Sequence, residues 1–470
     1  MDIDAGMEIV VVGGGMAGAR LAQQLAPAAP GVRVTLFGEE RHAPYNRVLL
    51  AEVLAGRYEP DVITLPDAAC TIRRAVRVDR AERLVICDDG SATRYDRLVL
   101  ATGSNPVLPP LRGLFEAGRG ELPLGVHAFR TMDDCLALSG ALRPRVRAVV
   151  VGGGLLGVSA ARALAARGAH VVLLQQGEYL MERQLDEQSG RLLRAHLESM
   201  GIEVHTECRV RGLRTTPDGT SQTAPTVPAA QTAQTAPTVR AAPTVRAVRS
   251  VELADGYCLG ADLVVLACGV RPRTGLAQAA GLEVDRGIVV DDELRTSDPF
   301  IHAIGDCSQH GGVVYGLANA AREQADALAL LLTEAARGPV PGRPADPPRY
   351  TGTRALTRLT LNGSPEPEPG PAPAATAAEP ARLGATGIAP FDLAAFGDPL
   401  PVPGDDVLRL TDATRGAYRK VVIRDDRLVG GILLGDLAAV GTLARTWEAD
   451  EPLPATSAPL LHLLTNDGGS

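Results

Sequence analysis

Aromatic side chains are scarce in this sequence, and long hydrophobic runs are missing from it. Phe, Trp and Tyr account for 3% of the 470 residues, whereas hydrophobic residues of all kinds account for 45%. Aliphatic side chains must therefore build the cores. The first apolar run, EIVVVGGGM, and every later one are too short to span a bilayer, and no basic stretch precedes the first as in a signal peptide. We expect a cytoplasmic protein with no membrane partner.

A surplus of basic residues is also missing. Lys and Arg together number 47 against 55 Asp and Glu, so the formal net charge is −8 at pH 7. A protein that binds nucleic acid needs a basic surface to meet the phosphates. We therefore expect no nucleic-acid partner.

The cysteines and histidines show no metal-binding spacing. None of the seven cysteines forms a C-x-x-C or C-x-x-x-x-C pair, which argues against a zinc ribbon and a redox disulfide. Motifs of the types H-x-x-x-H and H-E-x-x-H and haem-attachment motifs are absent as well, so we expect no metal site. Cys307 is the last cysteine, and the C-terminal third therefore offers no cysteine ligands for an iron–sulfur cluster. We interpret Cys268, inside the apolar run LVVLACG, as a buried packing residue.

The length and the pattern of short apolar runs predict two or three domains of α/β structure. A chain of 470 residues exceeds one ordinary core. Val/Ile/Leu runs alternate with helical segments rich in Ala, Leu and Arg, as in parallel sheets covered by helices. After residue 350 the pattern changes to strands with a turn at residues 424–427 and then a helix, which indicates a small α+β domain.

Two Pro/Thr/Ala-rich inserts interrupt this pattern, at about residues 215–246 and 364–381. Such sequence buries little, so we expect both inserts to be disordered and to carry no chemistry. The segments that flank the first insert, GIEVHTECRVRGL and AVRSVELADGYCLGADLVVLA, are predicted to be strands of one sheet joined by an overgrown hairpin loop.

The segment EIVVVGGGMAGARLAQQLA has the strand, glycine turn and helix of a dinucleotide site. Gly13, Gly15 and Gly18 form G-x-G-x-x-G, in which the backbone and the helix N-terminus bind a pyrophosphate. Glu40 follows Gly18 by 22 residues, near the end of a second strand. A carboxylate at this distance accepts a hydrogen bond from a ribose hydroxyl.

A second copy of the same device occurs in RAVVVGGGLLGVSAARALAARGAHVVLLQQ. Its glycines are Gly152, Gly154 and Gly157, and two complete copies indicate two dinucleotides. The second strand ends in Gln175, with neither the acid typical of NAD sites nor the arginine typical of NADP sites. Gln175 can still bind a ribose, and the missing cation favours NADH over NADPH.

In tandem, the two sites resemble the FAD-dependent pyridine nucleotide oxidoreductases, in which an NAD domain is inserted into an FAD domain. DRLVLATGSNP, with Thr102 and Gly103, resembles the family's middle motif. LRTSDPFIHAIGDCS resembles the flavin-ribitol motif, whose aspartate is Asp306 here and accepts from ribitol hydroxyls. An N-cap role for Asp306 is the alternative. ADLVVLACGVRPRTGLA, with Gly269, resembles the return strand, and GLANAAREQADALALLL is expected to direct a helix N-terminus at the flavin.

The resemblance implies two Rossmann-like domains and a C-terminal domain. We expect residues 1–118 and 265–345 to form the FAD-binding domain. Residues 119–264 would form the NAD(P)-binding domain, and residues 346–470 the α+β domain.

Among the family's branches, the sequence is most similar to the flavin part of NAD(P)H nitrite reductase large subunits and to the electron-transfer subunits of assimilatory nitrate reductase. The shared segments are PYNRVLLAEVLAG, YLMERQLDEQSG and GGVVYGLANAAREQA. Disulfide reductases place C-x-x-x-x-C where this chain has RHAPYNRVLLAEVLAG, so a dithiol relay is excluded. Rubredoxin and ferredoxin reductases share P-Y-x-R, in which Arg47 is a candidate for binding FAD phosphate. In those reductases Ser-Lys follows this motif, whereas this chain has Ala51 and Glu52 at the corresponding positions.

These motifs predict an enzyme that passes electrons from NADH (or NADPH) through FAD to a separate acceptor protein, with a nitrite or nitrate reductase favoured. A rubredoxin or ferredoxin reductase and a non-enzymatic NADH-sensing flavoprotein are the alternatives. Hydride transfer to a flavin needs no side-chain acid or base, so no catalytic residue is predicted. The C-terminal domain is expected to dock the acceptor through exposed charges such as Arg415, Arg419 and Lys420. Its alternative roles are to form a homodimer or to cover the FAD domain. Residues 179–185 are a further candidate for contact with the nicotinamide coenzyme.

Overall fold

The computed structural model describes residues 6–28, 31–66, 69–115, 121–217, 246–337, 349–354, 356–361, 391–412, 416–435, 437 and 439–453. The predicted insert at 364–381 lies outside the described residues, as does nearly all of the insert at 215–246.

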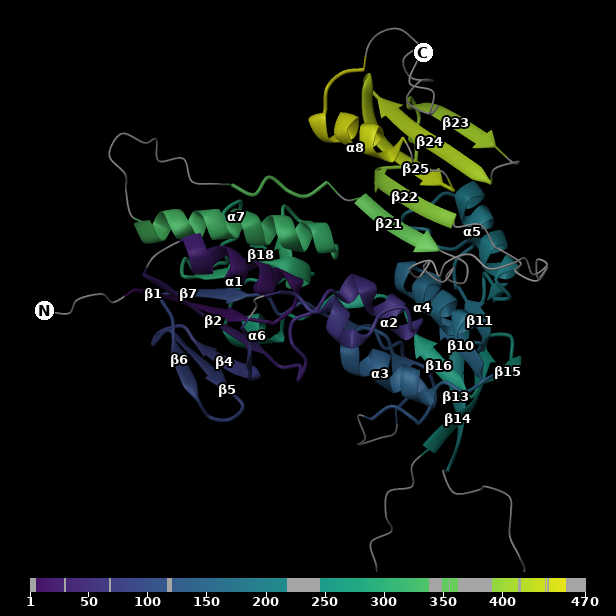
Figure 1. The fold of residues 1–470 in the computed structure, drawn as a ribbon, viewed down its shortest axis with the longest axis horizontal. Helices are drawn as coiled ribbons and strands as arrows, with labels where there is room; N and C mark the ends of the chain where they lie inside the picture. Colours follow the sequence, from purple (N-terminus) through teal and green to yellow (C-terminus); the bar gives the residue numbers. More distant parts are fainter. Residues whose placement is uncertain are drawn as a thin grey trace, which may run out of the picture.

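The first unit is built on a parallel five-stranded sheet with the order β19-β7-β1-β2-β3. These strands are β1 (Met7–Val12), β2 (Val32–Gly38), β3 (Thr71–Ile72), β7 (Arg97–Leu100) and β19 (Ile301–Ala303). Helices α1 (Met16–Ala28) and α7 (Ala318–Arg337) cover one face of the sheet (Figure 1). Strand β1 is buried along Ile9–Val12, which explains its unbroken apolar sequence.

The other side of this sheet carries small antiparallel elements (Figure 1). They are the antiparallel strands β4 (Ala75–Asp79), β5 (Leu84–Cys87) and β6 (Ala92–Arg94), with helix α6 (Gly275–Ala279) next to β4. Strands β18 (Ile288–Val290) and β20 (Ser308–His310) form a separate parallel pair. Short helices follow β2, namely η1 (Arg47–Leu49), α2 (Leu50–Leu54) and η2 (Pro60–Ile63).

The second unit repeats the parallel arrangement with the order β12-β11-β10-β16-β9. Its elements are β9 (Val126–Ala128), α3 (Met132–Ala141), β10 (Arg147–Val151), α4 (Leu155–Ala166), β11 (His170–Leu174), α5 (Glu187–Ser199), β12 (Glu203–His205) and β16 (Leu263–Leu266). The chain enters and leaves this unit through β8 (Ser104–Pro106) and β17 (Val270–Pro272), which pair with each other. The doubly wound α/β fold is therefore confirmed.

The hairpin around the first insert is confirmed, and its predicted flanks need a correction. Strands β13 (Val210–Pro217) and β14 (Arg246–Leu253) pair in antiparallel fashion, and β15 (Cys258–Gly260) extends the sheet. The outermost flanks, β12 and β16, belong instead to the parallel sheet. Strand β16 is buried along its whole length, whereas β12 buries only Val204. A sequence pattern of short apolar runs does not specify which strands pair with each other.

The C-terminal unit is a five-stranded antiparallel sheet with the order β21-β22-β25-β24-β23, backed by α8 (Val440–Ala449). Its strands are β21 (Leu356–Leu361), β22 (Phe391–Gly397), β23 (Asp406–Asp412), β24 (Ala417–Arg424) and β25 (Arg427–Leu434). The predicted turn at 424–427 is confirmed. Asp425 and Asp426 both have positive φ, of 50° and 59°, as a two-residue type I′ hairpin requires.

This C-terminal unit rests on α4 and α5 of the second unit (Figure 1). Tyr418 and Lys420 each donate a hydrogen bond of 2.8 Å to Asp186, the N-cap of α5. The ring of Phe391 stacks on His196 at 4.5 Å between ring centres. The C-terminal unit therefore covers the second unit. The alternative, in which it covers the first unit with its predicted FAD site, is wrong.

The expectation that Arg419 and Lys420 are exposed docking charges is also wrong. Both are buried, with exposed fractions of 4% and 1%. Lys420 faces the second unit, and Arg419 belongs to the opposite face of β24, against which α8 packs. Arg415 lies outside the described residues.

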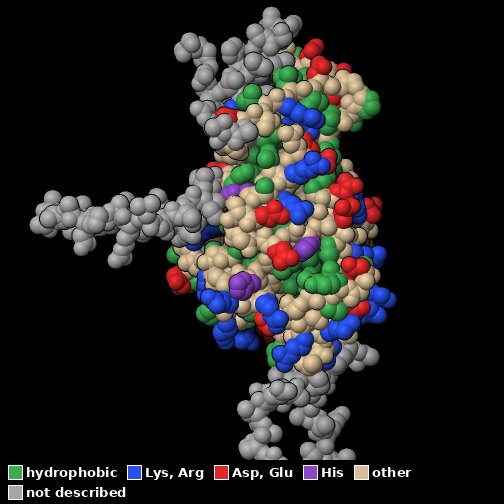
Figure 2. Space-filling model, turned by 90° about the vertical axis from the view of Figure 1, so that its right-hand side faces the viewer, with side chains coloured by type: hydrophobic (Ala, Val, Ile, Leu, Met, Phe, Trp, Pro, Cys, Tyr) green, Lys and Arg blue, Asp and Glu red, His purple; other side chains and the backbone are tan. Residues whose placement is uncertain are grey.

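The outer surface carries charges of both signs. On the face that Figure 2 shows, acidic and basic side chains occur together across the whole described surface. In the described part of the chain, no helix has both the length and the apolar character needed to cross a membrane.

Candidate functional site

One large cleft, of about 2100 Å³, runs between the first and second units and is bordered by β21 of the C-terminal unit. Most predicted site residues line it: Gly13, Gly15, Glu40, Arg47, Thr102, Gly103, Gly152, Gly154, Gln175, Gly269 and Asp306. Gly18 and Gly157 do not line it and lie behind its walls. The fold thus gathers both glycine loops and the predicted ribitol aspartate around one space.

The first glycine loop leaves room only at its second glycine. Gly13 has a φ of 124°, and a Cβ there would lie 2.0 Å from the carbonyl oxygen of Ala101. A Cβ on Gly18 would lie 2.1 Å from the oxygen of Gly13. At Gly15 the nearest atom to such a Cβ is the Nε of Arg47, at 4.0 Å. The loop therefore fits the close approach of a pyrophosphate beside a guanidinium.

The second glycine loop has the same construction. A Cβ on Gly152 would lie 2.4 Å from the oxygen of Ala267, and one on Gly157 would lie 1.8 Å from the oxygen of Gly152. At Gly154 the space is open, and this residue is the N-cap of α4 without a side-chain capping bond. The first N–H groups of α4 are thus left for a ligand. Both copies of the motif keep the geometry that a phosphate needs.

Arg47 is held in place by Glu40 and Tyr45. Arg47 forms an ion pair with Glu40, and the Tyr45 hydroxyl donates to Glu40 at 2.6 Å while it accepts from Arg47 at 3.0 Å. Burial raises the pKa of Tyr45 and keeps it a donor. Glu40 therefore orients Arg47 over the glycine loop. The contact of Glu40 with a ribose hydroxyl stays a prediction.

Glu39 is the residue that directly follows β2, and it pairs with Arg273. The hydrogen bond from Arg273 lowers the pKa of Glu39. The backbone oxygen of Arg273 also accepts from the Thr102 hydroxyl at 2.7 Å. This network joins the end of β2 to the turns that follow β7 and β17.

Asp306 lies on η3 (Gly305–Cys307), immediately after β19. Its Oδ2 accepts a hydrogen bond of 2.8 Å from the Ser104 hydroxyl and one of 2.5 Å from Arg130. Arg130 was missed by the sequence analysis. The only signal for it is its place just before Thr131, which caps α3 together with Asp134. Arg130 brings a second guanidinium to the predicted FAD side of the cleft.

The N-terminus of α7 opens into the cleft, as expected for a helix directed at the flavin. Residues 314–319 line the cleft wall. Helix α7 starts at Ala318, which is 12 residues after Asp306. The alternative role of Asp306 as the N-cap of this helix is therefore wrong, because β20 and a loop intervene.

The two cysteines near the cleft differ in exposure. Cys307 is fully buried, and its thiol donates to the oxygens of Leu100 and Ile304 at 3.3 Å each. Cys268 packs against the core of the second unit, as expected, but it is only half-buried and also lines the cleft. Within the described ranges all seven cysteines are unpaired, and no cluster of His, Cys, Asp and Glu could hold a metal ion.

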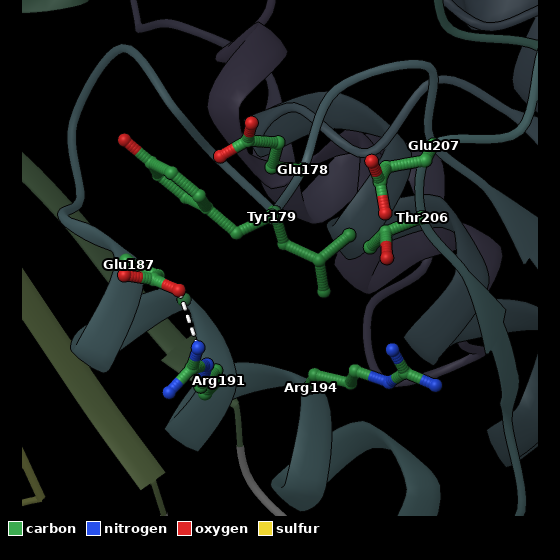
Figure 3. A pocket seen from close by; sticks show the side chains of 9 residues that line it. Glu178, Tyr179, Glu187, Arg191, Arg194, Thr206 and Glu207 are labelled. Atoms are coloured by element: carbon green, nitrogen blue, oxygen red, sulfur yellow. Dashed lines mark hydrogen bonds and ion pairs between the residues drawn. The ribbon is translucent and has the colours of Figure 1, made fainter.

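The loop after β11 has two faces. Residues 181–184 line the large cleft, as the expected contact with the nicotinamide coenzyme requires. Tyr179 belongs to a separate hollow of about 290 Å³ with Arg191 and Arg194 of α5. Figure 3 shows this hollow, in which Glu187 pairs with Arg191 and Tyr179 points away from Arg194. Tyr179 is therefore outside the large cleft, although the sequence grouped it with residues 180–185.

Comparison with known proteins agrees with this geometry. Residues 7–325 match the family model described as pyridine nucleotide-disulphide oxidoreductase. The chain belongs to this family. FAD and NAD(P)H are the cofactors expected of the family's reductases, and the two glycine loops fit both. Residues 385–449 match the rubredoxin NAD⁺ reductase C-terminal domain.

Relatives support the branch that the sequence favoured. Nitrite reductase [NAD(P)H] of Bacillus subtilis is 31% identical over 98% of this chain and 50% of its own length. The assimilatory nitrate reductase electron transfer subunit of the same organism is 31% identical over 91% of this chain and 47% of its own length. The chain spans about half the length of these two relatives. The ferredoxin–NAD⁺ reductase component of the biphenyl dioxygenase system from Paraburkholderia xenovorans is 31% identical over 63% of this chain.

Solved structures confirm the fold. Putidaredoxin reductase in its covalent complex with putidaredoxin covers 99% of this chain with a TM-score of 0.74 and 23% identity. NADH:rubredoxin oxidoreductase from Clostridium acetobutylicum covers 97% with a TM-score of 0.65 and 19% identity.

Asp306→Ala is expected to weaken FAD binding. The substitution removes a partly buried acceptor for ribitol hydroxyls, and each such bond is worth about 1–3 kcal/mol. The dissociation constant of FAD, measured by flavin fluorescence, should rise accordingly, while Glu203→Ala, at an acid 60% exposed on β12, serves as the control. An unchanged dissociation constant in Asp306→Ala would contradict the assignment.

Proposed function

We propose that this protein is an FAD-dependent NAD(P)H oxidoreductase of the cytoplasm that passes electrons to a separate acceptor protein. One observation supports this most directly. A single cleft is lined by both glycine loops, by Asp306 and by the N-terminus of α7. Two dinucleotides that enter from opposite ends of this cleft would meet between the two units.

The residues of the chain bind and orient the two cofactors. Arg47 and Arg130 supply positive charge for the FAD pyrophosphate, and Asp306 accepts from the ribitol. FAD, when bound, would supply the chemistry, namely acceptance of a hydride from the nicotinamide and release of electrons singly or in pairs. Where the units meet, the cleft is lined by Ala51, Leu155, Leu156 and Ser159. These side chains carry no charge and would keep water from the place where the two cofactors meet.

The acceptor we propose is a nitrate or nitrite reductase, because the relatives that match more than nine-tenths of the chain carry those names. A reductase for ferredoxin or rubredoxin is the second candidate. The match of residues 385–449 to the rubredoxin NAD⁺ reductase C-terminal domain favours it specifically. A flavoprotein that only senses NADH would be reduced without turnover. Measurement of the oligomeric state in solution tests whether the chain forms a homodimer.

The isolated protein is expected to reduce dyes with NADH but not to reduce nitrite or nitrate. Addition of the cognate nitrate or nitrite reductase should produce NADH-dependent turnover. Dye reduction and nitrite consumption, measured with each acceptor in turn, decide between the candidates. Turnover with rubredoxin or ferredoxin but with no nitrogen-oxide reductase would favour the second candidate, and nitrite reduction by the isolated chain would refute a separate acceptor.

The charges that dock the acceptor should lie at the rim of the cleft. Arg271 and Arg358 are exposed and line its edge. Substituting a rim charge mainly slows association and alters its salt dependence, so Arg271→Ala and Arg358→Ala should raise KM for the acceptor and leave KM for NADH unchanged. Arg409→Ala, an exposed arginine on the edge strand β23, is the matched control.

A further inference from the structure

An acidic side chain that sequence spacing did not indicate lies at the coenzyme end of the second unit. Gln175 follows β11, where an acid is expected in an NAD site. Its Nε2 donates to Glu182 at 3.4 Å, and its Oε1 accepts from the N–H of Gly153 at 2.8 Å. Gln175 therefore links Glu182 to the second glycine loop, and both side chains line the cleft.

The loop that carries Glu182 is fixed to the same glycine loop. Met181 is fully buried, has a φ of 54° and donates its N–H to the oxygen of Gly153 at 2.9 Å. Because a left-handed conformation is costly for a side chain such as that of methionine, the surrounding contacts must hold it. Leu180 and Leu185 on either side are buried as well. The position of Glu182 is thus built into the fold.

The Glu182 carboxylate is folded back over the turn after β11. Its Oε1 accepts the N–H of Glu178 at 2.8 Å, and a Cβ on Gly177 would lie 1.9 Å from the same oxygen. Among the described residues it has no ion-pair partner. No cation of the described chain therefore neutralises this carboxylate, and Glu182 lines the cleft.

We propose that Glu182, held by Gln175 and by the turn at Gly177, is the residue that selects NADH over NADPH. This inference rests on the proposed function. A carboxylate accepts hydrogen bonds from the adenosine ribose hydroxyls and repels the additional phosphate of NADPH. Gln175 stands where an NAD site usually has its acid, and it acts as a positioning residue for Glu182. Glu182, seven positions further along the chain, supplies the carboxylate instead.

Glu182→Gln tests the inference, because it removes the charge and keeps the size of the side chain. Binding of NAD⁺ and of NADP⁺ is measured by calorimetry on the FAD-loaded protein, and flavin reduction by NADH and NADPH by rapid mixing. The wild-type protein should prefer NADH and NAD⁺. Loss of a charged hydrogen bond should weaken NAD⁺ binding about tenfold and should strengthen NADP⁺ binding. The limiting rate of flavin reduction should stay the same.

Two further variants separate selection from a structural role. Gly177→Ala should displace the carboxylate without removing it, and we expect the same loss of preference for NADH. Arg183→Gln changes an exposed residue of the same cleft wall that could itself bind a phosphate, and we expect an unchanged preference. If the role of Glu182 were only structural, Glu182→Gln would weaken the binding of both coenzymes equally.

Three results overturn the inference. The first is a wild-type preference for NADPH that is lost in Arg183→Gln. The second is equal use of both coenzymes by the wild-type protein. The third is a ratio of NAD⁺ affinity to NADP⁺ affinity that is unchanged in Glu182→Gln. Each of these leaves the proposed function intact. Failure of both coenzymes to reduce the wild-type flavin overturns the proposed function as well.

Discussion

Gly157→Val is expected to slow reduction of the flavin by NADH at least about a hundredfold while FAD stays bound. A Cβ at residue 157 would lie 1.8 Å from the oxygen of Gly152 and 3.3 Å from the Cβ of Ala267. Helix α4 must therefore move away from β10, and its N-terminus leaves the coenzyme phosphates. Since a displacement of about 1 Å can cost about a hundredfold in rate, flavin reduction measured by rapid mixing should slow by at least that factor.

Gly18→Val is the matched control for this variant. Gly18 occupies the same place in the first loop, where a Cβ would lie 2.1 Å from the oxygen of Gly13. This substitution should release FAD, which the ratio of flavin to protein absorbance reports. If Gly157→Val also released FAD to the same extent, the assignment of the two loops to two cofactors would be wrong.

Lys420→Met is expected to destabilise the contact between the C-terminal unit and the second unit. The Lys420 ammonium is 1% exposed, and its partner Asp186 is 13% exposed. Removal of one member of a buried pair costs about 3–5 kcal/mol, because the other charge is left uncompensated. The fluorescence of Trp447, the single tryptophan, reports on this unit from its buried place on α8. Urea unfolding followed at this residue should shift to lower concentration.

This loss of stability should depend on pH. Burial by itself would raise the pKa of Asp186, but hydrogen bonds from Lys420, Ser189 and Tyr418 lower it to about 2. The unfolded value is about 3.9, so the pair stabilises the folded protein above pH 4, and this contribution disappears as the pH falls toward 2. The difference between the wild-type protein and Lys420→Met should be largest near pH 7 and should shrink below pH 4.

Arg427→Met supplies the control for the buried pair. Arg427 is 42% exposed, and its partner Asp450 is 56% exposed, so the loss of this ion pair should change the free energy of unfolding by no more than about 1 kcal/mol. An equal effect of the two substitutions, or an effect of Lys420→Met that does not vary with pH, would show that the pair does not carry the contact.

Local patterns made the cofactor loops predictable. G-x-G-x-x-G between a strand and a helix depends on neighbours within a few residues, so Gly13, Gly152 and their partners could be placed from spacing alone. The hairpin of β13 and β14 was predictable for the same reason, since its two strands adjoin the insert. Domain boundaries and the roles of individual site residues stay predictions.

Residues that act across the units escaped the sequence analysis. Arg130 reaches Asp306 from 176 positions earlier, and Lys420 reaches Asp186 across 234 positions. No periodicity connects such pairs. A polar residue inside a strand such as β24 looks solvent-exposed until the partner that buries it is known, which is why Arg419 and Lys420 were assigned to the surface.

The sequence by itself determined that this chain binds two dinucleotides in doubly wound domains, because glycine turns and strand periods act over short distances along the chain. Only the tertiary structure decided which charges meet. It placed Arg47 over Gly15, Arg130 on Asp306 and Glu182 beside Gln175. These contacts depend on the packing of helices and loops from separate parts of the chain, and packing is decided by the whole fold at once.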